Sequence, residues 1–237
     1  LRIGRALRSL GVEVCMIHGR EDRLSLPVRF SDDSRAILRS NPLDSYLDIE
    51  AVIDAAKSMG VDAVHPGYGF LAENADFVRR LEEEEITFIG PSSDVIRLLG
   101  DKIEARKAME AAGLPVAKGS SEPVSSADEA VSLATEIGYP VIIKAAAGGG
   151  GIGMQIVHDS SEFSSALNLC QSRARSAFGD DRVFVEKYIE GAQHIEFQVL
   201  ADGENAIHFG ERFCSIQRRH QKLLEEGPWL SDEVRSE

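Results

Sequence analysis

A cluster of glycines between two apolar runs is the feature of the sequence that most suggests chemistry: residues 140–154 read PVIIKAAAGGGGIGM. Three of the glycines satisfy G-x-G-x-x-G, the spacing of dinucleotide-binding turns. Such a turn is followed directly by a helix, because the pyrophosphate binds at the helix N-terminus. Residues 154–158, MQIVH, instead alternate and carry β-branched side chains, which is typical of a strand. The stretch therefore predicts a β-hairpin. It also fails the P-loop pattern, in which the lysine follows the glycines, whereas Lys144 precedes them.

A glycine-rich hairpin tip admits two interpretations. It is a plain surface turn, or it is a flap whose backbone N–H groups close on phosphate oxygens. In the second case Lys144, at the end of the first strand, adds a positive charge beside the same anion. These residues by themselves favour neither interpretation.

Four potential cations occur within six residues at positions 217–222, QRRHQK, in a chain that is otherwise acidic. A run of this kind is usually a solvated basic loop. In combination with a glycine flap and Lys144, an oxyanion-binding site is the better interpretation.

Two further segments lie at the ends of apolar runs, where open α/β sheets place ligand-binding loops. Residues 65–74, HPGYGFLAEN, taken alone are typical of a turn with proline and glycine. Residues 183–191, VFVEKYIEG, end an apolar strand with Glu186 and Lys187. The backbone of such a strand end can bind the edge of an adenine, with Glu186 accepting a hydrogen bond from its amino group.

The composition of the chain is that of a globular protein without nucleic-acid or membrane partners. Of 237 residues, 43% are hydrophobic and 27% are charged, and the net charge is −13. This acidic balance argues against binding to nucleic acid or to an anionic membrane. No apolar run approaches the roughly 20 residues of a membrane span. Cys15, Cys170 and Cys214 are odd in number and lack metal-site spacing, which favours a reducing compartment.

Helix and strand patterns alternate over the first hundred residues, which predicts a parallel sheet with helices on its faces. Gly60 and Gly100 are predicted to end two of the helices. Apolar spacing predicts helices up to residue 10 and over 46–59, 74–85 and 91–99, and strands over 12–17, 61–64 and 86–89.

From residue 101 the pattern becomes that of an α+β unit, so we expect one domain over residues 1–99 and a second over 100–237. A capping box formed by Ser126 and Glu129 predicts the start of a helix. The chain begins inside a helical pattern without an initiator Met and stops at the start of another helix, so we expect a fragment of a longer protein. Further helices are predicted over 101–112 and 161–178, and strands over 182–187, 194–200 and 205–210.

Five segments, in this order, resemble the biotin carboxylase subunit or domain of acetyl-CoA, propionyl-CoA, methylcrotonyl-CoA and pyruvate carboxylases. The resemblance implies an α/β fold in which a Rossmann-like (pre-ATP-grasp) domain, missing its first strand, precedes an incomplete ATP-grasp domain with a glycine-rich lid around residues 145–153. The segments are HPGYGFLAEN at 65–74, GDK at 100–102, IIKAAAGGGGIGM at 142–154, VEKYIEGAQHIEFQVLADG at 185–203 and ERFCSIQRRHQKLLEE at 211–226.

The resemblance implies an enzyme, a ligase that uses ATP and Mg²⁺ or Mn²⁺ to activate bicarbonate and to carboxylate biotin on a carrier protein or domain. It also implies a carboxyltransferase partner, a homodimer or larger complex, and a location in the cytoplasm or, in a eukaryote, the mitochondrial matrix. The family's metal ligands and general base would lie beyond residue 237, so no metal ligand is expected in this chain. We therefore expect the 237 residues alone to be inactive.

The resemblance also implies roles for individual residues. Lysines would neutralise phosphate charges, two lid glycines would close over the phosphates, and the strand end at 186–189 would hold adenine. For the two histidines, packed imidazoles remain an alternative. The implied residues are Lys222 for bicarbonate and, for ATP, Lys102, Lys144, Gly150, Gly151, Glu186, Lys187, Ile189, His194, Gln217 and His220.

Three positions depart from the family pattern. Ile152 stands where the lid usually has Arg or Lys, Phe213 where Asp is usual, and Gly227 where Ala, Ser or Thr usually precedes Pro. Two other functions stay open: a different ATP-grasp ligase, such as a carbamoyl-phosphate or purine-pathway enzyme, and an NAD-binding oxidoreductase. Residues 217–222 argue against the first, and the strand after Gly153 argues against the second.

Overall fold

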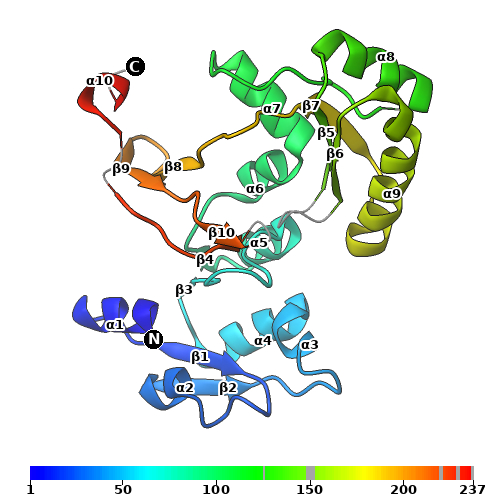
Figure 1. Ribbon diagram of the computed structural model, residues 1–237. Coiled ribbons are helices and arrows are strands. Elements are labelled where there is room, and N and C mark those ends of the chain that lie inside the picture. The colour runs from blue at the N-terminus through cyan, green and yellow to red at the C-terminus, as the bar shows by residue number, and fades with distance from the viewer. Residues whose placement is uncertain (125, 148–152, 219–220, 228–229, 236–237) are drawn as a thin grey trace. The chain divides into compact units, whose positions relative to one another are not determined.

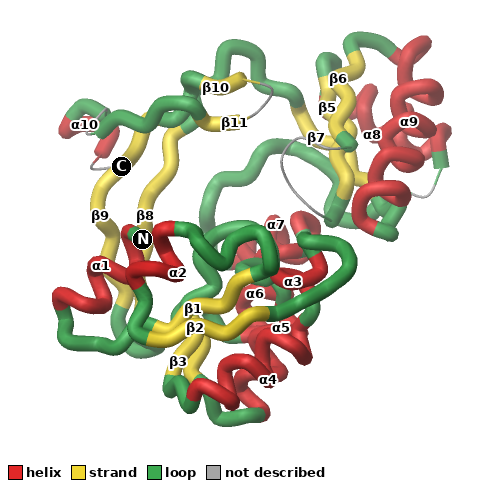
Figure 2. The backbone as a smooth tube through the Cα atoms, turned by 90° about the horizontal axis from the view of Figure 1, so that it is seen from below, coloured by secondary structure: helices red, strands yellow, loops and turns green. Residues whose placement is uncertain are grey.

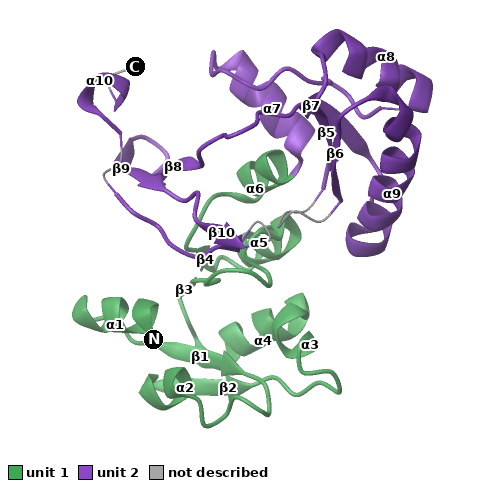
Figure 3. Ribbon diagram, viewed as in Figure 1, with its two compact units in different colours: residues 1–100 green, residues 101–237 purple. Residues whose placement is uncertain are grey.

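The structure is a computed structural model that describes residues 1–124, 126–147, 153–218, 221–227 and 230–235. The chain forms two compact units, residues 1–100 and residues 101–237 (Figure 3). Each unit contains its own cluster of buried apolar side chains. In the described ranges, no helix is both long and apolar enough to cross a membrane.

The first unit alternates helices with short parallel strands, as predicted (Figure 1). β1 pairs with β2 and β3 pairs with β4, so the described strands form two small parallel sheets and not the single sheet that was expected. The elements are α1 (Arg2–Ser9), β1 (Cys15–His18), α2 (Leu26–Phe30), β2 (Asp33–Ala36), α3 (Asp44–Leu47), α4 (Ile49–Met59), β3 (Ala63–Val64), α5 (Ala75–Glu83), β4 (Thr87–Phe88) and α6 (Ser93–Gly100).

The helix predicted over residues 46–59 is divided at Asp48. The Asp48 carboxylate accepts a hydrogen bond from the Ala51 N–H at 3.0 Å and so caps the start of α4. Gly60 ends the helix in the left-handed conformation, with φ of 62°, as predicted. A capping residue inside the apolar pattern therefore turned one expected helix into two.

The first strand begins at Cys15 and not at residue 12. The Val14 N–H donates to the side chain of Asp32 at 2.9 Å, and the Asp32 N–H donates to the Val14 carbonyl. Val14 thus bonds to a side chain at the point where the backbone ladder with β2 would start, and the regular pairing begins with Cys15 opposite Asp33.

The second unit contains an antiparallel three-stranded sheet in the order β6-β5-β7 and two separate hairpins, β8-β9 and β10-β11. Ser126 caps α8 as predicted, because its hydroxyl accepts the Glu129 N–H at 3.2 Å. The elements are α7 (Lys102–Ala111), α8 (Ala127–Ile137), β5 (Val141–Ala145), β6 (Met154–Val157), α9 (Ser160–Phe178), β7 (Val183–Lys187), β8 (Ile195–Ala201), β9 (Ala206–Phe213), β10 (Gln217–Arg218), β11 (Gln221–Lys222) and α10 (Asp232–Arg235).

The predicted hairpin around the glycines is confirmed. β5 and β6 run antiparallel, with Val141 opposite Val157 and Lys144 opposite Met154. Residues 148–152, which include Gly150 and Gly151, lie outside the described residues. A strand, and not a helix, thus follows the glycines, which is the arrangement that argues against a dinucleotide-binding turn.

The β6-β5-β7 sheet has two different faces. Helices α8 and α9 pack together on one of them, which we call the helix face (Figures 1 and 2). Successive side chains of a strand point to opposite faces, so the other face, the Lys144 face, carries the alternate residues Ile142, Lys144, Phe184 and Glu186. The helix face is filled by a buried cluster that includes Val141, Ile143, Val157, Phe163, Leu167, Cys170, Val183 and Val185.

The outer edge of β7 is covered by residues 118–124. Ser120 donates its N–H to the Val185 carbonyl at 2.7 Å, and its hydroxyl accepts the Val185 N–H at 3.0 Å. Gly119 lies so close to β7 that an added Cβ would stand 2.7 Å from the Val185 oxygen and 2.8 Å from the Glu186 Cβ. Only glycine fits at this position without displacing the strand.

The β8-β9 hairpin leaves large apolar side chains in contact with solvent. Phe209 is 66% exposed, and neighbouring apolar residues of both strands are about half exposed. A two-stranded ribbon has little stability of its own and needs a further element to cover one face. The exposed residues are Phe197, Val199, Leu200, Ile207 and Phe209.

We expect Gly119→Ala to lower the free energy of unfolding by about 1–3 kcal/mol, because the methyl group overlaps the β7 backbone. Gly100→Ala is the matched control, since an added Cβ there meets nothing within 4 Å and the backbone is not left-handed; its effect should stay within about 1 kcal/mol. Urea denaturation of the two variants measures both values. Equal stability of the two variants would mean that residues 118–124 do not approach β7 this closely.

Candidate functional site

An ion pair lies on the Lys144 face of the sheet. The Lys144 ammonium contacts the Glu186 carboxylate, and the two residues come from adjacent strands in diagonal positions. Their side chains keep 26% and 16% of their surface exposed, respectively. The pair is thus partly shielded from water but still accessible to a ligand. Partial shielding strengthens the electrostatic interactions of both charges relative to bulk water.

Lys187 points to the other side of the sheet. Its ammonium donates to the carbonyl oxygens of Gly138 at 2.9 Å and Tyr139 at 3.0 Å, directly after helix α8. Because Glu186 and Lys187 are neighbours on one strand, their side chains must leave opposite faces. The structure therefore places the side chains of Glu186 and Lys187, two residues of the strand end predicted to hold adenine, on opposite faces of the sheet. Ile189, the next predicted residue, is 59% exposed.

The N-terminus of α7 lies beside the start of the glycine segment. The Lys102 N–H donates to the Ala146 carbonyl at 3.2 Å, and Ile103 packs against Ala146 and Phe184. Asp101 caps the helix by accepting from the Ile103 N–H at 3.0 Å. The structure thus brings together the backbone at Lys102 and the end of the strand that carries Lys144. The first N–H groups of α7 already have partners, namely the Ala146 carbonyl and the Asp101 carboxylate.

A second group of predicted residues surrounds His194. The Gln217 amide lies 2.9 Å from His194 Nδ1 and donates to the Cys214 carbonyl at 2.8 Å. The backbone N–H of His194 donates a hydrogen bond to the Ser215 hydroxyl at 2.7 Å. These side chains line a pocket formed by Ala192, Gln193, His194, Ile195, Ser215 and Gln217.

Lys222 is held by a residue that the sequence did not single out, Glu196 on β8. One Glu196 oxygen contacts the Lys222 ammonium and lies 3.6 Å from His194 Nε2. The other oxygen contacts Arg212. The hydrogen bond from Lys222 is the main reason why the pKa of Glu196 is lowered below its usual value. The position of Glu196 inside an apolar strand is the only signal in the sequence that could have identified it.

Arg212 is followed by Phe213, where the family pattern usually has Asp, and other residues hold its guanidinium. Its guanidinium contacts Glu196, lies 3.2 Å from Glu225 and donates to Gln198 at 3.2 Å. Among the described residues, its Nε is buried without a hydrogen-bond partner.

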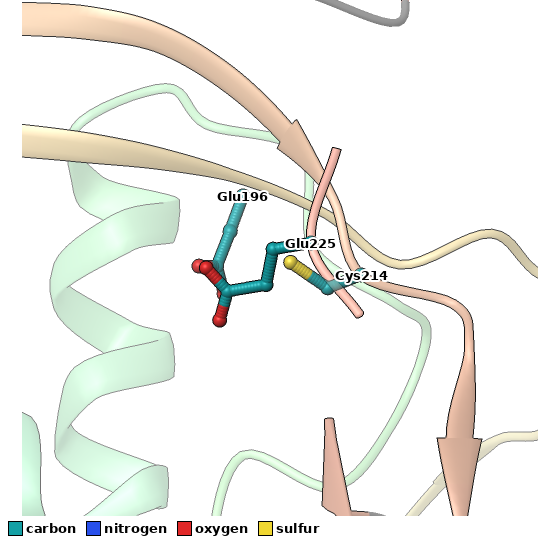
Figure 4. A group of neighbouring side chains, drawn as sticks. All are labelled: Glu196, Cys214 and Glu225. Atoms are coloured by element: carbon teal, nitrogen blue, oxygen red, sulfur yellow. The ribbon is translucent and has the colours of Figure 1, made fainter. Parts of the chain in front are cut away.

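Glu196, Cys214 and Glu225 converge in a small cluster, with ligand atoms within 4.8 Å of one another (Figure 4). Burial raises the pKa of the Cys214 thiol, and the two carboxylates raise it further. Arg212 and Lys222 already neutralise the carboxylates. A protonated thiol beside paired carboxylates does not fit Mg²⁺, which prefers an octahedron of oxygen ligands.

The predicted residues thus fall into two groups in the second unit. Lys102, Lys144 and Glu186 surround the base of the glycine segment, and His194, Gln217 and Lys222 surround Glu196. The described parts of the segment at 217–222, Gln217–Arg218 and Gln221–Lys222, form the strands β10 and β11. Gly150, Gly151 and His220 lie outside the described residues.

Comparison with known families and proteins accounts for nearly the whole chain. Residues 1–96 match the family "Biotin carboxylase, N-terminal domain", and residues 101–237 match "Carbamoyl-phosphate synthase L chain, ATP binding domain". The biotin carboxylase of Pseudomonas aeruginosa is 49% identical over 230 residues, which are 96% of this chain and 51% of that protein. Biotin carboxylase 1 of Bacillus subtilis is 49% identical over an alignment of 240 positions that covers 100% of this chain and 53% of that protein.

The structure of the chain also closely resembles solved structures of biotin carboxylases. A biotin carboxylase from Campylobacter jejuni in complex with β-γ-ATP gives a TM-score of 0.96 at 44% identity and covers 99% of this chain and 53% of that one. The biotin carboxylase domain of 2-oxoglutarate carboxylase from Hydrogenobacter thermophilus, with MgADP, ADP and bicarbonate, gives 0.95 at 45% identity and covers 99% and 52%.

The chain spans about half the length of these relatives. The predicted fold class, a Rossmann-like domain followed by part of an ATP-grasp domain, is confirmed by these neighbours. On both the sequence and the structural matches, the chain belongs to the biotin carboxylase family.

Proposed function

We propose that the protein to which this chain belongs is a biotin carboxylase, which uses ATP to carboxylate carrier-linked biotin with bicarbonate. The observation that carries the proposal is Lys222, whose ammonium is fixed by Glu196 beside the pocket formed by His194 and Gln217. A fixed ammonium is a suitable partner for a small oxyanion. Neighbours that bind ADP and bicarbonate support this choice of ligands.

In this proposal the Lys144 face receives the nucleotide. Lys144 and Lys102 would neutralise the phosphates with their ammonium groups, and Gly150 and Gly151 would close over them. Transfer of a phosphoryl group to a weak nucleophile depends mainly on positioning and on compensation of negative charge. Lys144 would then exchange part of its contact with Glu186 for a phosphate oxygen.

The adenine would be bound by the backbone at residues 186–189 together with the Glu186 carboxylate. Lys187 would take no part through its ammonium, which caps the end of α8 on the helix face. It would instead fix the strand end against the turn before β5, since the Tyr188 N–H also donates to the Pro140 carbonyl at 3.1 Å. This divides the roles of two adjacent residues by the face that each occupies.

Magnesium would bind together with the nucleotide, and the Hydrogenobacter neighbour is complexed with MgADP. In this chain the ion would compensate phosphate charge. The cluster of Glu196, Cys214 and Glu225 does not fit this ion, so no step is assigned to a metal held by the described residues. We propose a biotin carrier protein or domain and a carboxyltransferase as partners, and a cytoplasmic location.

We expect Lys222→Gln in the full-length enzyme to reduce ATP cleavage that depends on biotin and bicarbonate on the order of 10²-fold, because a fixed positive charge at a developing anion is lost. Nucleotide affinity should change little. Lys118→Gln, at an exposed lysine of the same unit, is the control. The measurement is phosphate release with and without biotin and bicarbonate. Wild-type turnover in the Lys222 variant would remove Lys222 from the site; cleavage that requires ammonia or glutamine in place of biotin would favour a carbamoyl-phosphate synthase-like enzyme.

Lys187→Met should lower the free energy of unfolding without nucleotide by about 1–2 kcal/mol, because two carbonyl groups after α8 lose a charged donor. Thermal unfolding without and with ATP measures this, and Lys118→Met serves as control. If Lys187 bound the base through its ammonium, stability without ATP would be unchanged and only the stabilisation by ATP would fall.

The Lys222–Glu196 pair should also give stability a defined dependence on pH. The pKa of Glu196 is lowered in the folded protein, so its contribution is complete above the unfolded value of about 4.5 and is lost as the pH falls through the lower folded value. The difference in free energy of unfolding between wild type and Glu196→Gln should therefore be constant near neutral pH and shrink below about pH 4.5. Glu204→Gln, in the exposed β8-β9 turn, is the control; a difference that is unchanged at low pH would contradict the pairing.

A further inference from the structure

A buried carboxylate on β9 is bound by a guanidinium from the last described helix. The Glu211 side chain is only 1% exposed. Its carboxylate accepts hydrogen bonds from Arg235 Nε at 3.1 Å and from a terminal guanidinium nitrogen of Arg235 at 2.6 Å. It also accepts a hydrogen bond from the backbone N–H of Leu230 at 3.1 Å. The same Arg235 group donates to the Leu230 carbonyl at 3.0 Å. Glu211 thus holds the backbone before α10 as well as the helix itself.

Such a carboxylate is costly to bury unless charged donors satisfy it. A two-point contact with one guanidinium is a strong and directional way to do so. The position of Arg235 relative to β9 is therefore set by geometry as well as by charge.

The chain between Lys222 and Leu230 is attached to β9 in two further places. Phe213 and Glu226 exchange backbone hydrogen bonds of 2.6 and 3.1 Å. Gly227 lies against the Glu211 backbone, where an added Cβ would be 2.6 Å from the carbonyl oxygen. Residues 223–227, which we call the return segment, thus lie along the end of β9.

The hairpin that presents Lys222 is small. In the described ranges its ladder consists of Gln217 opposite Lys222 and Arg218 opposite Gln221. A two-stranded ladder of this length is not stable alone. Its outgoing end is fixed by the Leu223 N–H, which donates to the Ile216 carbonyl at 2.9 Å, and then by the return segment.

We propose that the Glu211–Arg235 pair is a positioning element for Lys222. By fixing Leu230 and α10 to β9, it anchors the chain that follows the return segment, and so keeps that segment on β9 and the Lys222 ammonium in contact with Glu196. This inference rests on the proposed function of Lys222 in bicarbonate binding and extends it to two residues that touch no substrate.

The pair should affect bicarbonate more than ATP. Gln217 has its own attachments upstream of the hairpin, to His194 Nδ1 and the Cys214 carbonyl. Lys222 depends on Glu196 and on the return segment that follows it. Loosening the return segment therefore displaces Lys222 before it displaces the nucleotide contacts.

The test uses the full-length enzyme with Arg235→Met. The control is Arg175→Met, which removes an exposed ion pair between Arg175 on α9 and Asp181 after it. We expect Arg235→Met to raise the KM for bicarbonate about 10-fold or more, as displacement of a binding group commonly does. The KM for ATP should stay within about 2-fold of wild type, and Arg175→Met should change neither. Arg235→Lys, which keeps the charge but not the two-point contact, should fall between wild type and Met.

The double variant Glu211→Gln/Arg235→Met separates positioning from stability. Without a buried charge it should recover most of the melting temperature lost by Arg235→Met, but the KM for bicarbonate should remain raised. An unchanged KM for bicarbonate, an equal rise in both KM values, or full recovery of the KM in the double variant would overturn the inference. If wild type cleaves ATP without any requirement for bicarbonate and biotin, the proposed function itself fails, and the inference with it.

Discussion

The central strand β5 is the constraint on which the second unit depends. It is hydrogen-bonded on both sides, to β6 and to β7, and four of its five residues are buried. Its register fixes which residues face the helices and which face a ligand: Val141 and Ile143 join the core, whereas Lys144 reaches Glu186. A shift by one residue would exchange the two sets. The same strand leads into the glycine segment, so core packing also determines where that segment starts.

In a chain with a net charge of −13, the proposed anion-binding site depends on individual cations that are kept in place. Each important cation here is held by a particular carboxylate: Lys144 by Glu186, Lys222 by Glu196 and Arg235 by Glu211. Arg212 shares Glu196 with Lys222, so one carboxylate orients two positive groups. The net charge of −13 therefore describes the surface as a whole, while local pairs decide what each pocket attracts.

Local signals were sufficient to predict most of the helices and the glycine hairpin, whereas α2 and the division of the helix at Asp48 were not predicted. Ser126 and Gly60 act through their own neighbours in the chain, and the alternation after the glycines identified β6. The β10-β11 ladder was not predictable, because its pairing depends on attachments to β9. Glu196 was missed for a related reason, since its partners come from other strands. The opposite directions of the Glu186 and Lys187 side chains could have been inferred from strand geometry alone.

The segment that covers the edge of β7 has a consequence for the order of folding. Ser120 and Val185 are 65 residues apart in the sequence, whereas β5 and β6 are joined by a short hairpin. Closing the longer loop costs more chain entropy, and contacts of high sequence separation form slowly. We therefore expect β7 to join the sheet with its outer edge still open. During that interval the unpaired backbone groups of β7 can bind a second unfolded chain. The extent of aggregation at high concentrations of newly made chain therefore depends on how quickly residues 118–124 cover this edge.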